Sequence, residues 1–293
     1  MGEKQIVEVQ IINAFTDNDT GGNPAGVVFN ADHLTNDDKL KIAQKVGLSE
    51  TAFVSKSSKA DFKLDFFTPV RQIPHCGHAT IAVFSYLSQN GLVASGNTSK
   101  ETIDGRREIY VQGDTAFMEQ KAPIYTSIEQ YHSEMLSSLG LEDGDLYGEA
   151  PLLVVNTGNS FAVIPVKNAD TLKKVTPDFH RIAAISNELG LIGYYVFTPL
   201  AKSFQRDADA RMFAPAYGID EEAATGMAAG PLACYLNDQL GIKKQQFLIQ
   251  QGWHMKQPSP SLITVNLKIK NNAIAGLMAG GKAVSKDTFT IEF

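Results

Sequence analysis

The sequence has few cysteines, no excess of positive charge and no long apolar run. Two cysteines among 293 residues are too few for a disulfide scaffold, so we expect a reducing, cytoplasmic compartment. The net charge of −6 gives no general basic field for nucleic acid or an anionic membrane. No apolar stretch approaches the roughly 18 residues of a membrane span, and the first residues do not read as a signal peptide. We therefore expect no nucleic-acid partner and no membrane partner.

Motifs of several common enzyme classes are also missing. No Gly-x-Gly-x-x-Gly follows a strand pattern, and neither a phosphate-loop lysine motif nor a Gly-x-Ser-x-Gly elbow occurs. Nicotinamide, nucleotide and serine-hydrolase functions therefore lack support. The composition is 43% hydrophobic and 20% charged, which is enough apolar material for a sizeable folded core.

The two halves of the chain resemble each other. In each half, strand-like runs lead to a short motif, FFTP at 66–69 or MFAP at 212–215, and then to a helix of glycine and small apolar residues. We expect these helices at 77–91 and 221–241, and GNPAGVV near the start is echoed by GNSFAVI in the second half. The equivalent order of these segments indicates an internal repeat.

The remaining elements follow from periodicity and turn residues. Strands are expected at 4–15, 25–30, 51–56, 60–69, 106–120 (a hairpin across Gly113 and Asp114), 152–166, 193–199 and 202–215, and four more strand-like runs lie between the second central helix, which ends at 241, and residue 293. Helices are expected at 34–47 (capped by Thr35 or Asn36), near 133–140 and at 179–190.

The two small-residue helices are apolar on nearly every side, and such a helix must be buried. The pattern therefore predicts an α+β fold of two similar β-rich lobes, each wrapped around one central helix. If both helix N-termini face a cleft, their backbone N–H groups and positive dipole ends would make an anion site.

The segment IPHCGH at 73–78 concentrates reactive side chains at the start of the first central helix. Zinc needs three or four ligands; His75 and Cys76 are adjacent and point apart, and no second Cys/His cluster exists, so we predict no metal. Cys76 is either a small apolar residue at the helix entry or a thiol activated by the helix N-terminus. His78 is either satisfied by the helix end or part of a site.

Three carboxylates remain as candidates. Glu50 in LSETAFV is either a solvated turn residue or, between apolar walls, an acid and base usable near neutrality. Glu221 and Glu222, which precede AATG, would ordinarily serve the dipole of the following helix.

Five segments together carry a resemblance to a known family. These are NAFTDNDTGGNPAGVV at 13–28, LSETAFV at 48–54, FFTPVRQIPHCGHATIA at 66–82, TGNSFAVIPV at 157–166 and RMFAPAYGIDEEAATGMAAGPLACYL at 211–236. In this order they resemble the PhzF-like (phenazine biosynthesis-like) isomerase family of the diaminopimelate epimerase-like superfamily. The match is specific for the family and says little about the substrate.

The resemblance implies a fold and a reaction. Each lobe would be a β-barrel-like sheet around its central helix, with an N-terminal lobe of 1–123 plus a returning strand at about 282–293 and a C-terminal lobe of 124–281. The active site would lie between the lobes, and the enzyme would be a homodimer. It would move a proton on a small carboxylate-bearing substrate without a cofactor.

The resemblance also implies roles for individual residues. The catalytic glutamate of the family falls on Glu50, the active-site histidine on His78, and an acidic aspartate on Glu222. One carboxyl group can remove a proton at one carbon and return it at another on the same face, while His78 and backbone donors stabilise the intermediate. Residues expected to bind substrate are Asn23, Cys76, Gly77, Thr225, Gly226 and Met227.

Thiol epimerases of the superfamily use a second cysteine, which this chain lacks. Aligning the repeats on their helix-start glycines sets Thr225 opposite Cys76, and the register favoured by the superfamily sets Ala223 there. Cys234 lies about two turns into the helix. Two-thiol racemisation is therefore disfavoured.

Three departures from the family pattern bear on the substrate. Gln72 stands where the family has a glutamate, Glu222 is one methylene longer than an aspartate, and Met227 replaces a small, often hydroxylated residue. An isomerase remains the favoured function. The alternatives are an epimerase or racemase using Cys76, and a catalytically silent protein that binds small anions.

Overall fold

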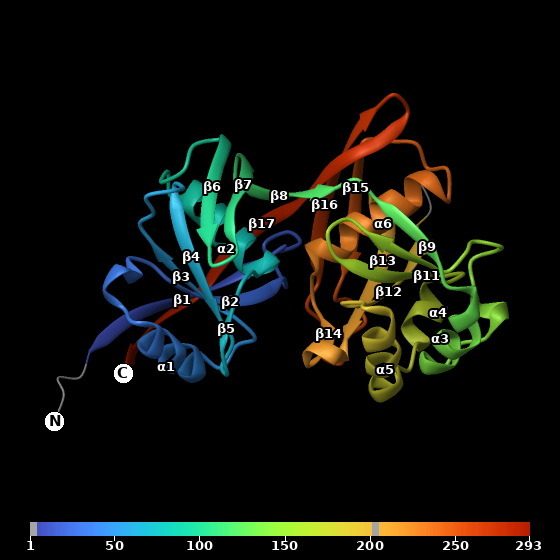
Figure 1. Ribbon diagram of the computed structural model, residues 1–293, viewed down its shortest axis with the longest axis horizontal. Helices are drawn as coiled ribbons and strands as arrows, with labels where there is room; N and C mark the ends of the chain where they lie inside the picture. Colours follow the sequence, from blue (N-terminus) through green and yellow to red (C-terminus); the bar gives the residue numbers. More distant parts are fainter. Residues whose placement is uncertain (1–4, 201–204) are drawn as a thin grey trace. The chain divides into compact units, whose positions relative to one another are not determined.

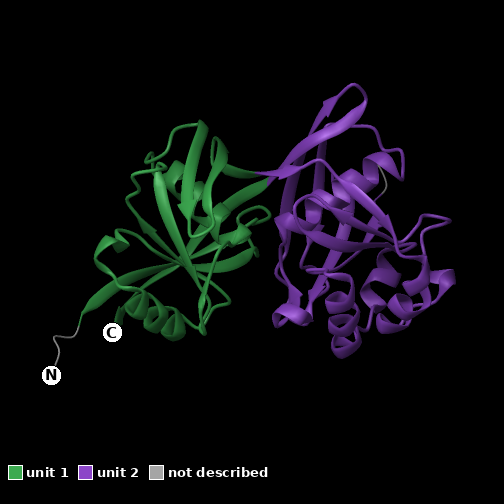
Figure 2. Ribbon diagram, in the orientation of Figure 1, with its two compact units in different colours: residues 1–118, 280–293 green, residues 119–279 purple. Residues whose placement is uncertain are grey.

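The computed structural model describes residues 5–200 and 205–293. The chain forms two compact units (Figure 2): unit 1 comprises residues 1–118 and 280–293, and unit 2 comprises residues 119–279. Whether these units are independent domains with the predicted boundaries stays a prediction. Lys4 and residues 202–204, which belong to two predicted strands, lie outside the described residues.

Unit 1 is a mainly antiparallel sheet around one helix (Figure 1). Its elements are β1 (Ile6–Ala14), β2 (Asn23–Val28), α1 (Asn36–Val46), β3 (Thr51–Ser55), β4 (Phe62–Phe67), β5 (Gln72–Ile73), α2 (Gly77–Gln89), β6 (Gly96–Thr102) and β7 (Gly105–Gln112). The chain then passes to unit 2 along β8 (Thr115–Lys121) and returns along β17 (Ala273–Glu292). The end of β17 pairs antiparallel with β1.

Unit 2 has the same plan with additional outer helices (Figure 1). Its elements are β9 (Ile124–Ser127), α3 (His132–Ser138), β10 (Leu153–Asn156), β11 (Ser160–Pro165), α4 (Ala169–Lys174), α5 (Phe179–Leu189), β12 (Gly193–Pro199), β13 (Ala208–Ala214), β14 (Ile219–Glu222), α6 (Gly226–Asp238), β15 (Gln246–Gln251) and β16 (Ser261–Lys270).

The strand pairings repeat from one unit to the other. In unit 1, β1–β2 is antiparallel, β2–β3 parallel, β3–β4 antiparallel, β4–β6 parallel and β6–β7 antiparallel. In unit 2, the pairs β10–β11, β11–β12, β12–β13, β13–β15 and β15–β16 follow the same sequence of directions. The two units therefore share one topology, and the predicted internal repeat is confirmed.

Each unit buries its central helix against equivalent strands. Helix α2 packs on β1, β2, β3 and β7, and α6 packs on β10, β11, β12 and β16. Buried side chains run almost without interruption along both helices, from His78 to Ser85 in α2 and from Ala228 to Asn237 in α6. The expectation that helices apolar on every side are buried is confirmed, as is the α+β fold of two barrel-like sheets.

The other helices are amphipathic and cover the outside of the sheets. Helix α1 contributes Ile42 and Ala43 to an apolar cluster with strand residues of unit 1. Helices α3, α4 and α5 contribute Met135, Leu172 and Ile182 to a second cluster in unit 2. Of the two possible caps of α1, Thr35 is the one used, in a capping box with Asp38.

Two sequence predictions about element limits were wrong. The helix expected from 221 begins at Gly226, because Glu221 and Glu222 belong to β14, which pairs with β13. Of the four strand-like runs at the end, the last two form the single 20-residue strand β17. A Cβ at Gly280 would lie 2.1 Å from the Ala116 carbonyl oxygen, so this glycine allows a close backbone approach and does not mark a turn.

The sequence patterns also missed the short helix α4 and the strands β6, β9 and β14. Helix α4 has only six residues and depends on a cap from Asn168, which is too short for a periodic signal. Within residues 5–200 and 205–293, no helix has the length and apolar character required to cross a membrane.

Candidate active site

Three of the predicted residues meet inside unit 1. Glu50 directly precedes β3, Cys76 is the N-cap of α2, and His78 is the second residue of that helix. Because α2 packs against β3, the carboxylate is brought to the start of the helix. His78 Nε2 lies 3.5 Å from Glu50 Oε2, and Cys76 Sγ lies 3.5 Å from His78 Nδ1.

The imidazole therefore lies between a thiol and a carboxylate. The His78 and Glu50 side chains are only 5% and 13% exposed, and Cys76 is also buried. In such an environment charges interact more strongly than in water. The arrangement can hold and move a proton among the three groups or toward a bound molecule.

The same three residues offer a carboxylate, a thiol and an imidazole, which are also metal ligands. One donor atom of each lies within 4.8 Å of the other two. The thiol and the carboxylate, however, make their short contacts with opposite ring nitrogens, and one ion could bind only one of these.

The two central helices lack a side-chain cap, as does the short outer helix α3, whose N-cap is Tyr131. Helices α1, α4 and α5 have side-chain caps from Thr35, Asn168 and Asp178. Cys76 and Thr225, the N-cap residues of α2 and α6, make no side-chain cap hydrogen bond. The first turns of the central helices thus keep backbone donors and a positive dipole end that can interact with an anion.

A polar cluster forms at the start of α6 in unit 2. The Thr225 hydroxyl donates to Glu222 Oε2, so two predicted residues are in contact. Gln251, fully buried, donates to the Glu222 carbonyl (2.7 Å) and to Thr225 Oγ1 (3.2 Å). Its Oε1 accepts from Tyr195 Oη (2.8 Å) and from Thr225 N (3.2 Å). Gln251 therefore organises the chain that leads into the helix.

Gln120 and Asn159 support the same helix. Gln120 Nε2 donates to the Gly226 carbonyl at 2.9 Å. Asn159 Nδ2 donates to Met227 Sδ at 3.2 Å, so the thioether is an acceptor for a protein amide. Sequence inspection missed Gln120, Asn159 and Gln251, because isolated amides on strands and turns belong to no motif that we recognised.

Two more residues singled out in the sequence, Asn23 and Gln72, also lie in unit 1. Asn23 is buried at the start of β2, opposite Ala14. Gln72, where the resemblance implies a glutamate, donates to Asp65 Oδ1 at 3.3 Å. A glutamate there would face that carboxylate, so the amide removes a repulsion.

Glu221 does not serve the dipole of α6, as the sequence had suggested. Its carboxylate accepts from Arg211 Nε (2.8 Å) and Nη2 (3.0 Å). Arg211 is buried and also donates to the carbonyls of Leu172 and Val175. This ion pair therefore links β14 to β13 and has a structural role.

Cys234 lies in the middle of α6 and is fully buried. Burial and the nearby Asp238 raise the pKa of its thiol. The chain has no third cysteine, so unit 2 supplies no thiol that could act on a substrate.

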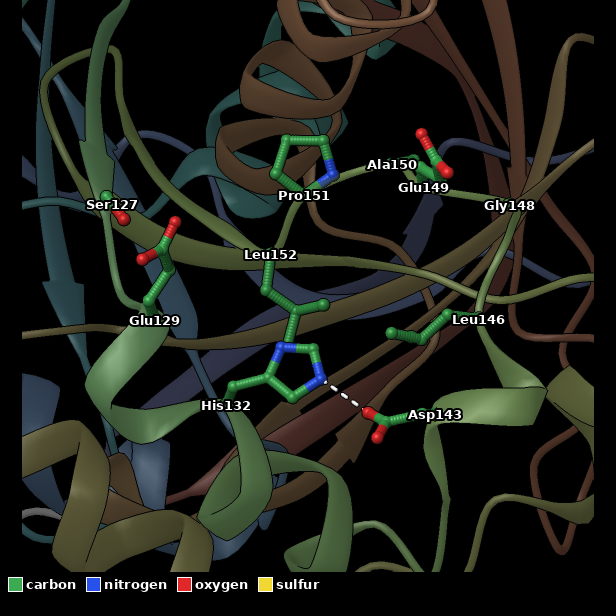
Figure 3. A pocket seen from close by; sticks show the side chains of 10 residues that line it. All are labelled: Ser127, Glu129, His132, Asp143, Leu146, Gly148, Glu149, Ala150, Pro151 and Leu152. Atoms are coloured by element: carbon green, nitrogen blue, oxygen red, sulfur yellow. Dashed lines mark hydrogen bonds and ion pairs between the residues drawn. The ribbon is translucent and has the colours of Figure 1, made fainter.

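Unit 2 also contains a cavity of about 360 Å³ that shares no residue with the predicted site (Figure 3). Within it, His132 Nε2 and Asp143 Oδ1 lie 2.7 Å apart. Its acidic lining disfavours an anionic ligand. The lining residues are Ser127, Glu129, His132, Asp143, Leu146, Gly148, Glu149, Ala150, Pro151 and Leu152.

Comparisons with known proteins agree with this architecture. An uncharacterized isomerase of Clostridium acetobutylicum is 36% identical over 77% of this chain and 77% of its own length. The trans-2,3-dihydro-3-hydroxyanthranilate isomerase of Pseudomonas chlororaphis is 31% identical over 85% of this chain and 87% of its own length. The crystal structure of a Bacillus anthracis phenazine biosynthesis protein of the PhzF family has a TM-score of 0.87 at 26% identity, covering 98% and 99% of the two chains.

The family comparison covers nearly the whole chain. Residues 12–288 match the family described as phenazine biosynthesis-like protein. The resemblance seen in the sequence motifs is thereby confirmed, and so is the predicted enzyme class. The chain belongs to the phenazine biosynthesis-like (PhzC–PhzF) family of isomerases.

Proposed function

We propose that this enzyme moves a proton between two carbons of a small carboxylate-bearing substrate, with Glu50 as the single acid and base and without a cofactor. The observation that carries the proposal is the approach of Glu50 Oε2 to His78 Nε2, 3.5 Å apart, in a buried part of unit 1. A carboxylate and an imidazole at this spacing are suited to general acid–base catalysis.

The step is an allylic shift of the 1,3 or 1,5 type. Glu50 takes a proton from one carbon, the double-bond electrons move along the substrate, and Glu50 returns the proton to another carbon on the same face. Glu50 Oε2 is buried and has no hydrogen bond from the described residues, so its lone pairs remain for the substrate proton. His78 would stabilise the negative charge that develops in between.

The substrate carboxylate would bind to backbone donors at the start of α2, near Asn23, Cys76 and Gly77. We propose that Glu222 and the start of α6, with Thr225, Gly226 and Met227, contribute further contacts to the same molecule. The missing side-chain caps of both helices support an anionic group. The Pseudomonas chlororaphis relative acts, by its name, on a carboxylate, trans-2,3-dihydro-3-hydroxyanthranilate.

An epimerase is the second candidate, and the contact between Cys76 and His78 favours it. With Sγ 3.5 Å from Nδ1, the imidazole could accept the thiol proton, and the resulting thiolate could then remove a proton from a stereocentre. A one-thiol epimerase would need Glu50 or another group on the opposite face. It would invert a stereocentre in D₂O and lose activity in Cys76→Ser.

The deciding experiment is proton exchange in D₂O. The purified full-length protein is incubated with a panel of cyclic and amino-acid carboxylates that includes trans-2,3-dihydro-3-hydroxyanthranilate, and deuterium is located by NMR. We expect deuterium at one allylic carbon together with a shifted double bond. Inversion without a double-bond shift would support the epimerase, and anion binding without any exchange would support a silent binder.

The homodimer and the cytoplasmic location also remain proposals. Light scattering of the purified chain tests the first. Fractionation of the cells that produce it tests the second.

A further inference from the structure

Unit 1 buries a lysine completely. Lys100 lies in the middle of β6 and has no exposed surface. Lysine is almost never fully buried unless it is paired, because removing an ammonium from water is costly. The carboxylate nearest in the sequence, Glu101, accepts from the Ser57 hydroxyl and pairs with Lys59, and Asp104 pairs with Arg107. The ion pairs of the described residues include no carboxylate partner for Lys100.

Three groups surround the Lys100 amino group. Nζ lies 3.0 Å from His75 Nδ1, donates to Thr80 Oγ1, and lies 4.9 Å from the centre of the Phe66 ring. The rings of Phe66 and His75 are themselves in edge contact, with centroids 6.3 Å apart. An acceptor nitrogen, an acceptor hydroxyl and an aromatic face form a cage suited to the three N–H groups of an ammonium.

A hydrogen bond connects this cage to the N-cap residue of α2. The Thr80 hydroxyl accepts from Lys100 and donates to the Cys76 carbonyl at 2.6 Å. His75 immediately precedes Cys76. Lys100 therefore contacts His75, which precedes Cys76, and Thr80, which follows His78.

The internal repeat provides a comparison for this lysine. Lys100 pairs with Phe62 of β4, and Ile249 pairs with Ala208 of β13. Aligning FFTP with MFAP sets Phe62 opposite Ala208, so Lys100 and Ile249 occupy equivalent positions. Ile249 is also fully buried. Unit 2 therefore forms the same topology with an apolar residue at the position equivalent to Lys100.

The lysine's partners are replaced as well. Aligning the repeats on the glycines at the helix starts sets His75 opposite Ala224 and Thr80 opposite Ala229. Both alanines are fully buried. Because the fold forms in unit 2 without these three polar groups, their presence in unit 1 calls for a reason other than folding.

We propose that Lys100 is a positioning residue for the reaction at Glu50, holding the segment His75–Thr80 so that His78 stays beside the carboxylate. The proposal rests on the proposed function. It adds a residue that does not touch the substrate and acts through Thr80, His75 and Cys76.

The charge of Lys100 depends on its surroundings. Burial lowers the pKa of Lys100 to about 7; the Cys76 thiol and Asp104 raise it, and Arg107 lowers it further. Burial, with Lys100 and Arg107, lowers the pKa of His75 to about 2, so His75 remains a neutral acceptor. The ammonium therefore loses its proton near neutral pH, and its hold on the segment weakens as the pH rises through about 7.

The test compares Lys100→Met with Lys39→Met in the full-length protein. Lys39 is another buried lysine of unit 1, but it pairs with Asp65 at 2.6 Å and, among the described residues, forms no hydrogen bond or ion pair with the cage. Exchange kinetics are measured from pH 5.5 to 9, and the ring nitrogens of His78 are followed by ¹⁵N NMR. Thr80→Ala introduces the residue type found at the equivalent position of unit 2. It removes the hydrogen bond to the Cys76 carbonyl and leaves Lys100 in place.

We expect Lys100→Met to fold and to lower kcat roughly ten- to a hundredfold, the cost of a misplaced catalytic group, with a smaller change in KM. The wild-type advantage should be greatest below pH 7 and shrink above it. The His78 nitrogen shifts should change in Lys100→Met and in Thr80→Ala, and stay unchanged in Lys39→Met.

Wild-type kinetics and unchanged His78 shifts in Lys100→Met would overturn the proposal. A loss of activity that follows only a loss of folded protein, with an unaltered pH profile, would also overturn it by showing a merely structural role. If Lys100→Met does not fold, the His78 nitrogen shifts of Thr80→Ala decide whether this segment positions the histidine. If the wild type exchanges no substrate proton, the proposed function fails, and the His78 shifts still decide whether Lys100 positions the histidine.

Discussion

Glu50 Oε2 and His78 Nε2 face each other across 3.5 Å inside unit 1, although 28 positions separate the two residues in the sequence. The separation exceeds the roughly 2.7–3.2 Å of a good N–H···O hydrogen bond. The carboxylate is therefore close enough to interact with the imidazole and is not held by it. This relationship underlies the predictions about activity.

Glu50→Gln should retain the fold and the affinity for small anions, because the two side chains have nearly the same shape. It should lose substrate-dependent deuterium incorporation by roughly 10²–10⁴-fold, since the amide cannot accept and return the proton. Glu108→Gln, at an exposed position of the same unit, is the matched control and should exchange like the wild type. Full activity in Glu50→Gln would refute the role of this carboxylate.

Cys76→Ala should reduce exchange about tenfold or less, because the thiol contacts His78 and need not transfer the substrate proton. Turnover numbers from the D₂O assay check this. If Cys76→Ala abolishes exchange while Glu50→Gln keeps it, the reaction belongs to the thiol, and the epimerase becomes the better description.

Gln251→Met should lower the free energy of unfolding by at least about 2 kcal/mol, because Gln251 is the hydrogen-bond partner of several buried groups, including Tyr195 Oη. Urea unfolding measures the loss. Adding Tyr195→Phe to this variant should cost little more, since the hydroxyl has already lost its partner. Strictly additive losses would contradict the network.

Lys39→Met should destabilise the protein by at most about 3–5 kcal/mol, because it removes the shorter lysine contact of the buried Asp65 and leaves Lys63 at 3.4 Å and the Gln72 amide. Asp65→Leu in the same chain should recover much of this loss. Lys41→Met is the matched control, because the Lys41 side chain is 60% exposed, and it should change the unfolding free energy by less than about 0.5 kcal/mol.

Stability should rise with pH between about 7 and 10.5 because of Lys100. Burial lowers the pKa of its ammonium from 10.5 to about 7, so in this range the unfolded chain binds a proton that the folded chain has released. The slope from one proton is about 1.4 kcal/mol per pH unit. Below pH 7 both states are protonated, and the penalty for burying the charge is complete and constant.

Urea titrations of the wild type and Lys100→Met at several pH values measure this contribution. The unfolding free energy of the wild type should increase relative to that of Lys100→Met as the pH rises from 7 toward 10.5. A difference that is independent of pH would show that Lys100 keeps an ordinary pKa in the folded protein.

Several features follow from local patterns. The apolar character of the two central helices required burial on all sides, and the sequence placed the start of α1 at Thr35 or Asn36, of which Thr35 is the cap. The echoed motifs were sufficient to indicate a repeat, because each repeat must rebuild the same strand, turn and helix from its own residues. The motif segments also identified the family and the positions of Glu50 and His78.

Tertiary packing decided what those residues touch. The contact of Glu50 with His78 depends on β3 lying against α2, and the polar cluster at Thr225 depends on Gln251 from a strand that follows the helix. Glu221 turned from a helix charge into the partner of Arg211, because strand pairing placed it opposite β13. Sequence neighbours carry no signal for contacts of this kind.

Lys100 shows most clearly how the environment of a residue in the fold can differ from the one that its sequence neighbours suggest. In the sequence it is one lysine in a polar run, SKET, which by composition belongs on the surface. In the fold, strand alternation turns its side chain into the unit, where His75, Thr80 and Phe66 enclose it. The chain's periodicity and motifs therefore determined its topology and family, whereas the environment of each charge was decided by long-range packing, because burial depends on residues distant in the sequence.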